Sequence, residues 1–278
     1  MEWFLIFVSV AVVWLASLCK ILHSSFYPNQ SPFLNNNAGS IQKKNVLLVI
    51  AHPDDESMFF SPTINQLTSR GHNVHILCMS TDGIGDVRKE ELYRASAILK
   101  LPLQQVTALD HPDFQDGFGK VWNSNKLAKI VEKKIFAHAI DMVYQSLFHN
   151  LQVATPHHQS IWKIITFDNY GVSGHCNHRD VHQGVRRFIL DTSKRYIEAW
   201  ELVSSNIVRK YSGPIDIWLS FWSVKGEMHC LVNEHPLRSY AAMSQHLSQW
   251  VWFRKLFVSF SSYTYVNTLR KINNGQVL

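Results

Sequence analysis

The fold of this chain is decided by residues 46–56, which read Val46-Leu47-Leu48-Val49-Ile50-Ala51-His52-Pro53-Asp54-Asp55-Glu56. The first five are aliphatic without a polar interruption, which is typical of a strand buried on both faces of a parallel sheet. An imidazole and three carboxylates follow where that strand must end, and Pro53 can begin a helix because its missing N–H would be unpaired there anyway. Ligands of open α/β sheets bind at the carboxyl ends of strands. The stretch therefore predicts a polar site whose composition suits a metal ion.

Strand and helix patterns alternate downstream of this stretch. We expect strands at 46–50, 74–79, 106–109 and 164–168, and helices at 55–70, 87–99, 126–137 and from about 178 to 189. Gly71 is expected to terminate the first helix. Further strand-like pieces lie at 196–203, 206–210 and 215–221. Such alternation predicts an α/β domain with a mostly parallel sheet and right-handed crossovers.

The amino terminus is a candidate membrane anchor. Residues Trp3 to Cys19 are almost entirely apolar, near the short end of the roughly 17–25 residues that a membrane-spanning helix needs. A cleaved signal peptide is the alternative, but no basic region precedes the run. Lys20, Lys43 and Lys44 on its carboxyl side favour a cytoplasmic body. We therefore expect an anchor at 1–22, a linker at 23–44 and a catalytic domain at 45–278.

The apolar residues around 250–260 are interrupted by Arg254 and Lys255. They predict either a helix that covers the core or an amphipathic face that touches a bilayer, and we expect the former.

Composition limits the classes of function. Apolar residues make up 46% of the 278-residue chain and charged residues 17%, so global disorder is excluded. A net charge of +6 suits an anionic partner, but no basic run or RNA-binding signature indicates nucleic acid. The four cysteines form no Cys-x-x-Cys pair, which favours a reducing compartment over a disulfide scaffold.

Two pairs of residues have spacings that suit metal ligation. His52 and Asp55 are three residues apart, so both can converge on one ion. His175 and His178 have the same spacing in a glycine-rich loop at the start of a helix, and His178 is our candidate for the third ligand. Zinc accepts histidine nitrogen and carboxylate oxygen, and a catalytic zinc keeps one position open. Iron or manganese would also be accepted by such a set.

The remaining polar residues of the two motifs supply the rest of a hydrolytic site. Asp54 points away from Asp55, because consecutive residues do so, and is free to act as general base toward water. His175 is free to stabilise an oxyanion or to protonate a leaving group. The two motifs hold no activated Ser or Cys, so a covalent intermediate is not required. The pattern predicts metal-assisted amide hydrolysis.

Each of these assignments has a structural alternative. An isolated His-Pro-Asp-Asp can be a capped turn, and Glu56 is better suited to the helix dipole than to a metal. Arg88 is our candidate for binding an anionic substrate group, but it could equally belong to a solvated helix face with intrahelical ion pairs.

Other histidines are assigned structural or peripheral roles. We expect His72 and His75 to be structural and His111, which precedes Pro112 and Asp113, to lie on a substrate-side loop. A metal role for His157 and His158 is disfavoured.

The paired motifs resemble those of the LmbE-like (PIG-L) zinc de-N-acetylase family. The resemblance rests on Ala-His-Pro-Asp-Asp-Glu at 51–56 and Gly-Val-Ser-Gly-His-Cys-Asn-His at 171–178, with support from Met58-Phe59-Phe60-Ser61-Pro62-Thr63, Arg88-Lys89-Glu90-Glu91-Leu92, Thr166-Phe167-Asp168, Val208-Arg209-Lys210-Tyr211 and Trp252-Phe253-Arg254-Lys255-Leu256. It covers residues from about 45 to 262, and it implies a Rossmann-like three-layer α/β/α fold.

The resemblance also implies roles for particular residues. It matches His52, Asp55 and His178 to zinc ligands, Asp54 to the general base and His175 to the histidine beside the reacting carbonyl. The membrane-bound branch of the family removes acetate from N-acetylglucosaminyl-phosphatidylinositol on the cytoplasmic face of the endoplasmic reticulum. This implies a glycolipid substrate and the membrane as partners, with no protein partner inferable. There are two alternatives: deacetylation of another aminosugar conjugate, and a catalytically silent variant that serves as a membrane-bound partner.

Residues 144–163 depart from the family pattern. Ile140 to Val143 predicts the start of a strand that would run almost directly into Ile165 in the family, yet about twenty residues intervene without turn chemistry. One hypothesis is that residues 163–167 rebuild the strand and the insert loops out from its beginning. The other is an alternative or mis-spliced product with a distorted site and impaired activity.

Overall fold

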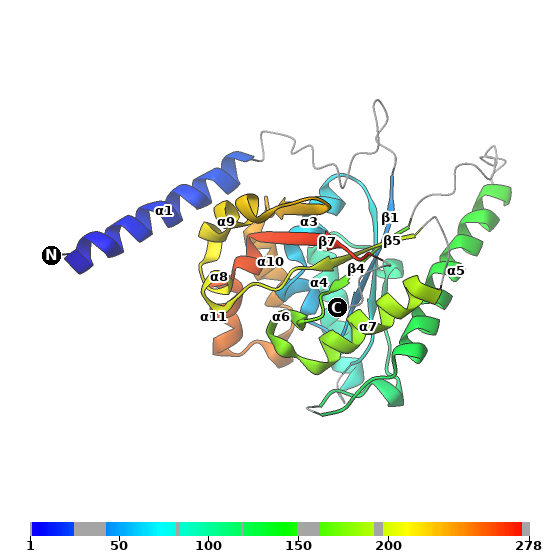
Figure 1. Ribbon diagram of the computed structural model, residues 1–278. Coiled ribbons are helices and arrows are strands. Elements are labelled where there is room, and N and C mark those ends of the chain that lie inside the picture. Colours follow the sequence, from blue (N-terminus) through cyan, green and yellow to red (C-terminus); the bar gives the residue numbers. More distant parts are fainter. Residues whose placement is uncertain are drawn as a thin grey trace.

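A computed structural model describes residues 2–24, 43–81, 84–117, 119–148, 162–191 and 197–273 (Figure 1). Its centre is a seven-stranded sheet in the order β3-β2-β1-β4-β5-β7-β6. The strands are β1 Asn45–Ile50, β2 Asn73–Cys78, β3 Val106–Ala108, β4 Trp162–Phe167, β5 Ile197–Leu202, β6 Met228–Val232 and β7 Val266–Lys271. The first five strands are parallel, and β7 is antiparallel to both β5 and β6. The predicted α/β fold with a mostly parallel sheet is confirmed.

Helices cover both faces of this sheet (Figure 1). The α-helices are α1 Glu2–Ser24, α2 Asp55–Met58, α3 Ser61–Ser69, α4 Gly85–Ile98, α5 Ser124–Phe148, α6 Gly171–Gly174, α7 Cys176–Asp191, α8 Ile207–Lys210, α9 Asp216–Ser223, α10 Pro236–Met243 and α11 Trp252–Phe260. Short 3-10 helices are η1 Leu103–Gln105, η2 Pro112–Phe114, η4 Gly213–Ile215, η5 Leu247–Gln249 and η6 Ser262–Thr264. With right-handed crossovers, α3 and α4 lie on one face, and α5 and α7 on the other.

Strand β1 lies at the middle of the core, as its aliphatic sequence predicts. Residues 46–50 are at most 1% exposed, and β1 is paired with β2 on one side and β4 on the other. The chain leaves β1 toward β2 and β3, then crosses back over β1 through α5 to reach β4. The strand order therefore reverses between β1 and β4, and this switch point is where open α/β sheets bind ligands.

Several sequence predictions are wrong in detail. The helix expected at 55–70 is two helices, because the chain turns at Phe59 and Phe60 between α2 and α3. The strands expected at 206–210 and 215–221 are the helices α8 and α9. Short apolar runs do not distinguish a buried strand from a helix by periodicity alone, which explains both errors. Gly71 does have the positive φ, +74°, expected of a helix terminator.

The region around the atypical insert also differs from expectation. Residues 140–143 belong to α5, which continues to Phe148, so the strand predicted to begin at Ile140 is wrong. Strand β4 is nevertheless complete: it begins at Trp162, pairs with β5 over its whole length and pairs with β1 along residues 162–165. Residues 149–161, including His157 and His158, lie outside the described residues.

Helix α1 is a long apolar helix at the amino-terminal end of the described residues. Among the described residues, it contains the one segment long and apolar enough to span a bilayer, Glu2–Ile21, with a mean hydropathy of 2.4. Only 11% of that segment is buried against the rest of the protein. Its carboxyl end does pack: Ile21 joins a small core with Ile217 and Val266.

Candidate active site

The loop after β1 places His52, Asp54 and Asp55 at the carboxyl edge of the sheet. Asp55 closes this loop, because its Oδ2 accepts hydrogen bonds from the backbone N–H groups of Ala51, at 3.1 Å, and His52, at 2.8 Å. Asp54 has φ 118° and ψ −22°, a left-handed conformation that is costly for a residue with a Cβ. This backbone directs the adjacent carboxylates of Asp54 and Asp55 into different surroundings.

The loop after β4 supplies the second half of the site. Gly171 has φ +66°, and a Cβ there would lie 2.9 Å from the Cβ of His178, so only glycine fits. The His178 ring stacks on Phe167 with centroids 4.0 Å apart, and its Nδ1 lies 3.2 Å from the Gly171 carbonyl oxygen. His178 is thereby held on both its face and its edge.

The turn that precedes His175 is also strained and firmly held. Val172 has φ 65°, which is rare for a β-branched residue. Its N–H donates to Ser204 Oγ at 2.8 Å, and its carbonyl accepts from the Lys210 ammonium at 2.7 Å. Asp168, at the end of β4, accepts from Gly171 N–H and from both the N–H and the hydroxyl of Ser204. Strain maintained by so many contacts is typical of functional turns.

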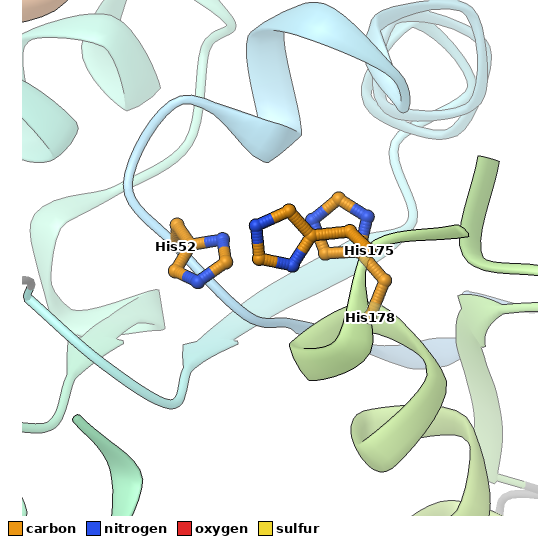
Figure 2. A group of neighbouring side chains, drawn as sticks. All are labelled: His52, His175 and His178. Atoms are coloured by element: carbon orange, nitrogen blue, oxygen red, sulfur yellow. The ribbon is translucent and has the colours of Figure 1, made fainter. Parts of the chain in front are cut away.

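The two loops meet at the switch point. Ring nitrogens of His52, His175 and His178, one from each, lie within 4.8 Å of one another. Figure 2 shows the three rings gathered between the loop after β1 and the start of α7. His178 Nε2 is 3.2 Å from Asp55 Oδ1, and His52 Nδ1 is 3.9 Å from Asp55 Oδ2. Imidazole nitrogens and a carboxylate, all mostly buried, form a donor set that fits a divalent cation such as zinc.

The pKa values reflect this crowding. Burial alone would raise the pKa of Asp55, but the charge and hydrogen bond of His178 and the backbone N–H of His52 outweigh it, so the pKa lies below its usual range. Burial lowers the pKa of His175 to about 4, and His178 and His52 act in the same direction. Asp55 is thus an anion and His175 a neutral imidazole near pH 7.

Asp54 occupies a separate, cationic environment. It is 4% exposed, and its Oδ2 accepts a hydrogen bond from the Arg254 guanidinium of α11. A second guanidinium, that of Arg88, is 3.7 Å from the same oxygen. Burial raises the pKa of Asp54, while Arg254 opposes that rise. The general-base assignment of Asp54 stays a prediction.

Arg88 does not lie on a solvated helix face, which was the alternative to a substrate-binding role. It is 5% exposed, and its Nη2 donates to the carbonyl oxygen of Pro53 at 2.6 Å. Glu91, on the same helix, is also buried and accepts from the N–H and hydroxyl of Ser248. Arg88 therefore contacts the backbone of the first motif, and substrate binding by it stays a prediction.

Glu56 is a buried structural partner of the site. Its Oε2 accepts from the Asp54 N–H at 3.0 Å, and its Oε1 is 2.7 Å from His246 Nε2. Both side chains are fully buried. Burial alone would lower the pKa of His246, but Glu56 overcomes it and the pKa is raised. The Glu56–His246 pair thus holds the Asp54 backbone in place through the Asp54 N–H. The sequence had suggested only a helix-dipole role for Glu56.

Three residues at the site were not found by sequence reasoning. Asn177 Nδ2 is 3.0 Å from His52 Nε2 and also donates to Asp116 Oδ1 at 3.0 Å. Asp116 is 3.4 Å from His52 Nε2, and a hydrogen bond with His52 lowers its pKa to about 2. Asn177 could have been noticed between the two motif histidines, whereas Asp116 and Arg254 carry no local signal.

His111, His72 and His75 are not among the three histidines of the cluster. His111 is partly exposed, and its Nδ1 accepts from the backbone N–H of Asp113. His72 and His75 are buried, and His72 Nδ1 accepts from the backbone N–H of Lys44 at 3.2 Å.

Comparison with known proteins places this fold and site in one family. The family described as PIG-L, GlcNAc-PI de-N-acetylase, matches residues 47–189. A protein named N-acetylglucosaminyl-phosphatidylinositol de-N-acetylase from Bos taurus is 32% identical over 80% of this chain and 81% of its own length. A probable enzyme of the same name from Dictyostelium discoideum is 30% identical over 86% of this chain and 98% of its own.

A solved structure supports the fold. The N,N'-diacetylchitobiose deacetylase of Pyrococcus horikoshii superposes with a TM-score of 0.53 at 15% identity, covering 93% of this chain and 92% of that one. The class of protein is therefore a deacetylase with an α/β core. Within it, the chain belongs to the GlcNAc-PI de-N-acetylase (PIG-L) family.

Proposed function

We propose that the protein hydrolyses the acetamide of N-acetylglucosaminyl-phosphatidylinositol to glucosaminyl-phosphatidylinositol and acetate, the second step of GPI-anchor biosynthesis. The observation that carries this proposal is the convergence of His52, His175, His178 and Asp55 beside a separately held Asp54. The names of the bovine and Dictyostelium relatives support the choice of substrate.

The ligand set is the first part of the mechanism. His52, Asp55 and His178 would hold the cation, which we propose is zinc. When bound, it supplies Lewis-acid chemistry that polarises the amide carbonyl and makes a water more acidic. His178 is oriented for this role because Phe167 and the Gly171 carbonyl fix its ring.

Asp54 and His175 perform the proton transfers and charge stabilisation. Asp54 accepts a proton from the attacking water and passes it to the amine as the C–N bond breaks, leaving acetate. Arg254 holds the Asp54 carboxylate in place during this transfer. His175, whose ring centroid is 4.7 Å from that of His178, stabilises the oxyanion that develops on the carbonyl.

The cellular setting follows from α1. We infer that α1 is an uncleaved anchor in the endoplasmic reticulum membrane and that the catalytic domain, with the insert at 144–163, faces the cytoplasm. The unbroken β4 supports an active enzyme rather than an impaired variant, because β4 carries the loop that bears His175 and His178.

The test is acetate release by the purified full chain from the acetylated glycolipid, and from a soluble N-acetylglucosamine conjugate. The proposal predicts hydrolysis of the glycolipid that a chelator abolishes and added zinc restores. Hydrolysis of the soluble conjugate alone would assign another aminosugar substrate. No hydrolysis of either compound by metal-loaded protein would support the impaired variant.

A further inference from the structure

Three short helices expose an unusual number of large apolar side chains. In α11, Trp252 is 72% exposed, and Phe253, Leu256 and Phe260 are each half exposed or more, while Val258 is buried. Further exposed members come from α8, from Tyr211 directly after it and from α9: Ile207, Val208, Tyr211, Trp218, Leu219, Phe221 and Trp222. We call these residues of α8, α9 and α11 the apolar face. Single exposed apolar residues are ordinary, but a cluster of this kind marks an interaction surface.

The apolar face adjoins the carboxyl half of α1. Trp218 of α9 donates a hydrogen bond from its indole N–H to Ser17 of α1 at 2.9 Å, and the Lys20 ammonium lies 3.8 Å from the Trp218 ring centroid. A Cβ on Gly213 would be 2.9 Å from the Trp14 indole nitrogen and 3.4 Å from the Phe260 carbonyl oxygen. Figure 1 shows α8, α9 and α11 gathered on the side from which α1 projects.

The length of α1 indicates that the apolar face is covered by lipid. A bilayer core of about 30 Å requires about 20 helical residues, so a span over Glu2–Ile21 places Trp14 and Ser17 within the membrane boundary. The elements that pack against Trp14 and Ser17 must then reach the same boundary. Trp, Tyr and Lys are the residues that favour the interface between lipid and water. Trp218 and Trp222 lie in α9, Trp252 and Lys255 in α11, and Tyr211 directly after α8, while the Lys20 ammonium lies over the Trp218 ring.

From this continuity we propose that the apolar face of α8, α9 and α11 rests in the headgroup region of the bilayer that α1 spans. The protein would thus have an interfacial contact in addition to its anchor. The helix expected at 250–260 does pack against the core through Phe257, but α11 is amphipathic, and most of its apolar side chains are exposed.

Helix α11 contacts the candidate active site on the side that faces away from the proposed lipid surface. On the side of α11 opposite its exposed residues, the Arg254 guanidinium donates a hydrogen bond to Asp54, and the Phe257 ring contacts that of Phe59 with centroids 5.6 Å apart. A helix is about 10 Å across, so the site would lie about one helix width from the lipid surface. A substrate with a reacting headgroup amide could therefore be processed while its acyl chains remain in the bilayer. This consequence rests on the proposed function, but the lipid contact does not.

Lipid photolabelling of the unmodified full chain tests the contact directly. The protein is reconstituted in phosphatidylcholine–phosphatidylinositol vesicles that contain a carbene-generating phospholipid, and the labelled peptides are mapped. We expect labelling in peptides 207–222 and 252–260 as well as in α1, and none at the exposed Leu190. Labelling confined to α1 overturns the proposal, whether or not the protein proves to be a deacetylase.

A variant experiment separates a lipid contact from a structural role. Trp252→Ser, Phe253→Ser and Leu256→Ser are combined, with Leu103→Ser and Leu190→Ser as the control for exposed apolar residues elsewhere. We expect the first set to lose about tenfold or more activity on bilayer-embedded glycolipid but not on a short-chain soluble analogue. Equal loss on both substrates, or equal loss by the control, contradicts the proposal.

Discussion

Asp54 and Asp55 share a peptide bond, yet their carboxylates lie in different surroundings. Asp55 faces His178 and the backbone of its own loop, whereas Asp54 faces the guanidinium of Arg254. The left-handed backbone of Asp54 separates them, and Glu56 holds that backbone through the Asp54 N–H. At the scale of single residues, a strained backbone thus separates the neighbouring acids, as the proposed roles of Asp55 as ligand and Asp54 as base require.

Glu56→Gln tests whether this support matters for activity. In the glutamine variant an NH₂ group would face a donor from which the carboxylate now accepts a hydrogen bond. We therefore expect the free energy of unfolding to fall by about 2 kcal/mol. We also expect kcat to fall about tenfold with KM and metal content unchanged, because Asp54 would lose its fixed position. Steady-state kinetics and thermal unfolding measure both quantities.

Ser57→Ala is the matched control, because it removes only the hydroxyl hydrogen bond to Glu56 Oε1. It should keep kcat near the wild-type value. A destabilised Glu56→Gln enzyme with unchanged kcat would mean that Glu56 supports the fold alone.

The meeting of His52, Asp55 and His178 could be predicted from sequence because both motifs follow buried strands of a parallel sheet, whose carboxyl ends share one edge. The Arg254 contact could not be predicted. It lies 200 residues from Asp54 in the chain and depends on the path of α11 across the site. The burial of Arg88 was equally hidden, because charged residues on a helix normally indicate a solvated face.

At the scale of elements, the crossing of α5 and α7 fixes the helix that carries His178. Gly184 of α7 allows this close approach, since a Cβ there would lie 2.5 Å from the Cβ of Leu127 in α5. Gly184→Ala should therefore destabilise the protein by about 1–3 kcal/mol, although alanine is the better helix former. Thermal unfolding measures this, with Arg187→Ala on the exposed side of α7 as control. A stabilised Gly184→Ala protein would contradict this packing.

Most of the elements that the sequence did not predict are late in the chain. Strands β6 and β7 pair antiparallel next to β5. The regular alternation of strand and helix that indicated β1 to β5 therefore ends there. Helix α9 reads Asp-Ile-Trp-Leu-Ser-Phe-Trp-Ser, and its β-branched and aromatic residues resemble a strand. The segment is nevertheless a helix, and the Trp218 indole N–H donates a hydrogen bond to Ser17 of α1.

At the scale of the whole molecule, buried histidines make stability depend on pH. Burial lowers the pKa of His72 to about 4, with Lys44, Arg70 and Lys163 acting in the same direction. At His72 the folded state therefore binds fewer protons than the unfolded state between about pH 4 and 6.5, so the contribution of this residue to stability falls as pH falls through this window.

His72→Asn should reduce that loss, because the amide oxygen can still accept from the Lys44 N–H but does not titrate. Melting temperature measured between pH 7 and 4.5 should decline less steeply in the variant than in the wild type. His111→Asn, at a partly exposed position, is the control and should decline like the wild type. Equal slopes for all three proteins would exclude His72 as a source of the pH dependence.

In the whole molecule, the candidate site lies between the sheet and the elements that pack against the apolar helix α1. The switch point between β1 and β4 brings together the two motifs, and α11 lies between that point and the exposed apolar face beside α1. The sequence predicted the sheet edge and the anchor as separate features. Their spatial relation could not be predicted, because it arises from the packing of α1 on α9 and η4.

The central claim is that Asp54 acts on water while His52, Asp55 and His178 hold the metal. The most direct test is to measure bound metal and acetate release together for Asp54→Asn and wild type on N-acetylglucosaminyl-phosphatidylinositol. We predict that Asp54→Asn keeps the metal content of the wild type and loses activity by about a thousandfold. Unchanged turnover, or loss of the metal along with activity, would contradict this division of roles.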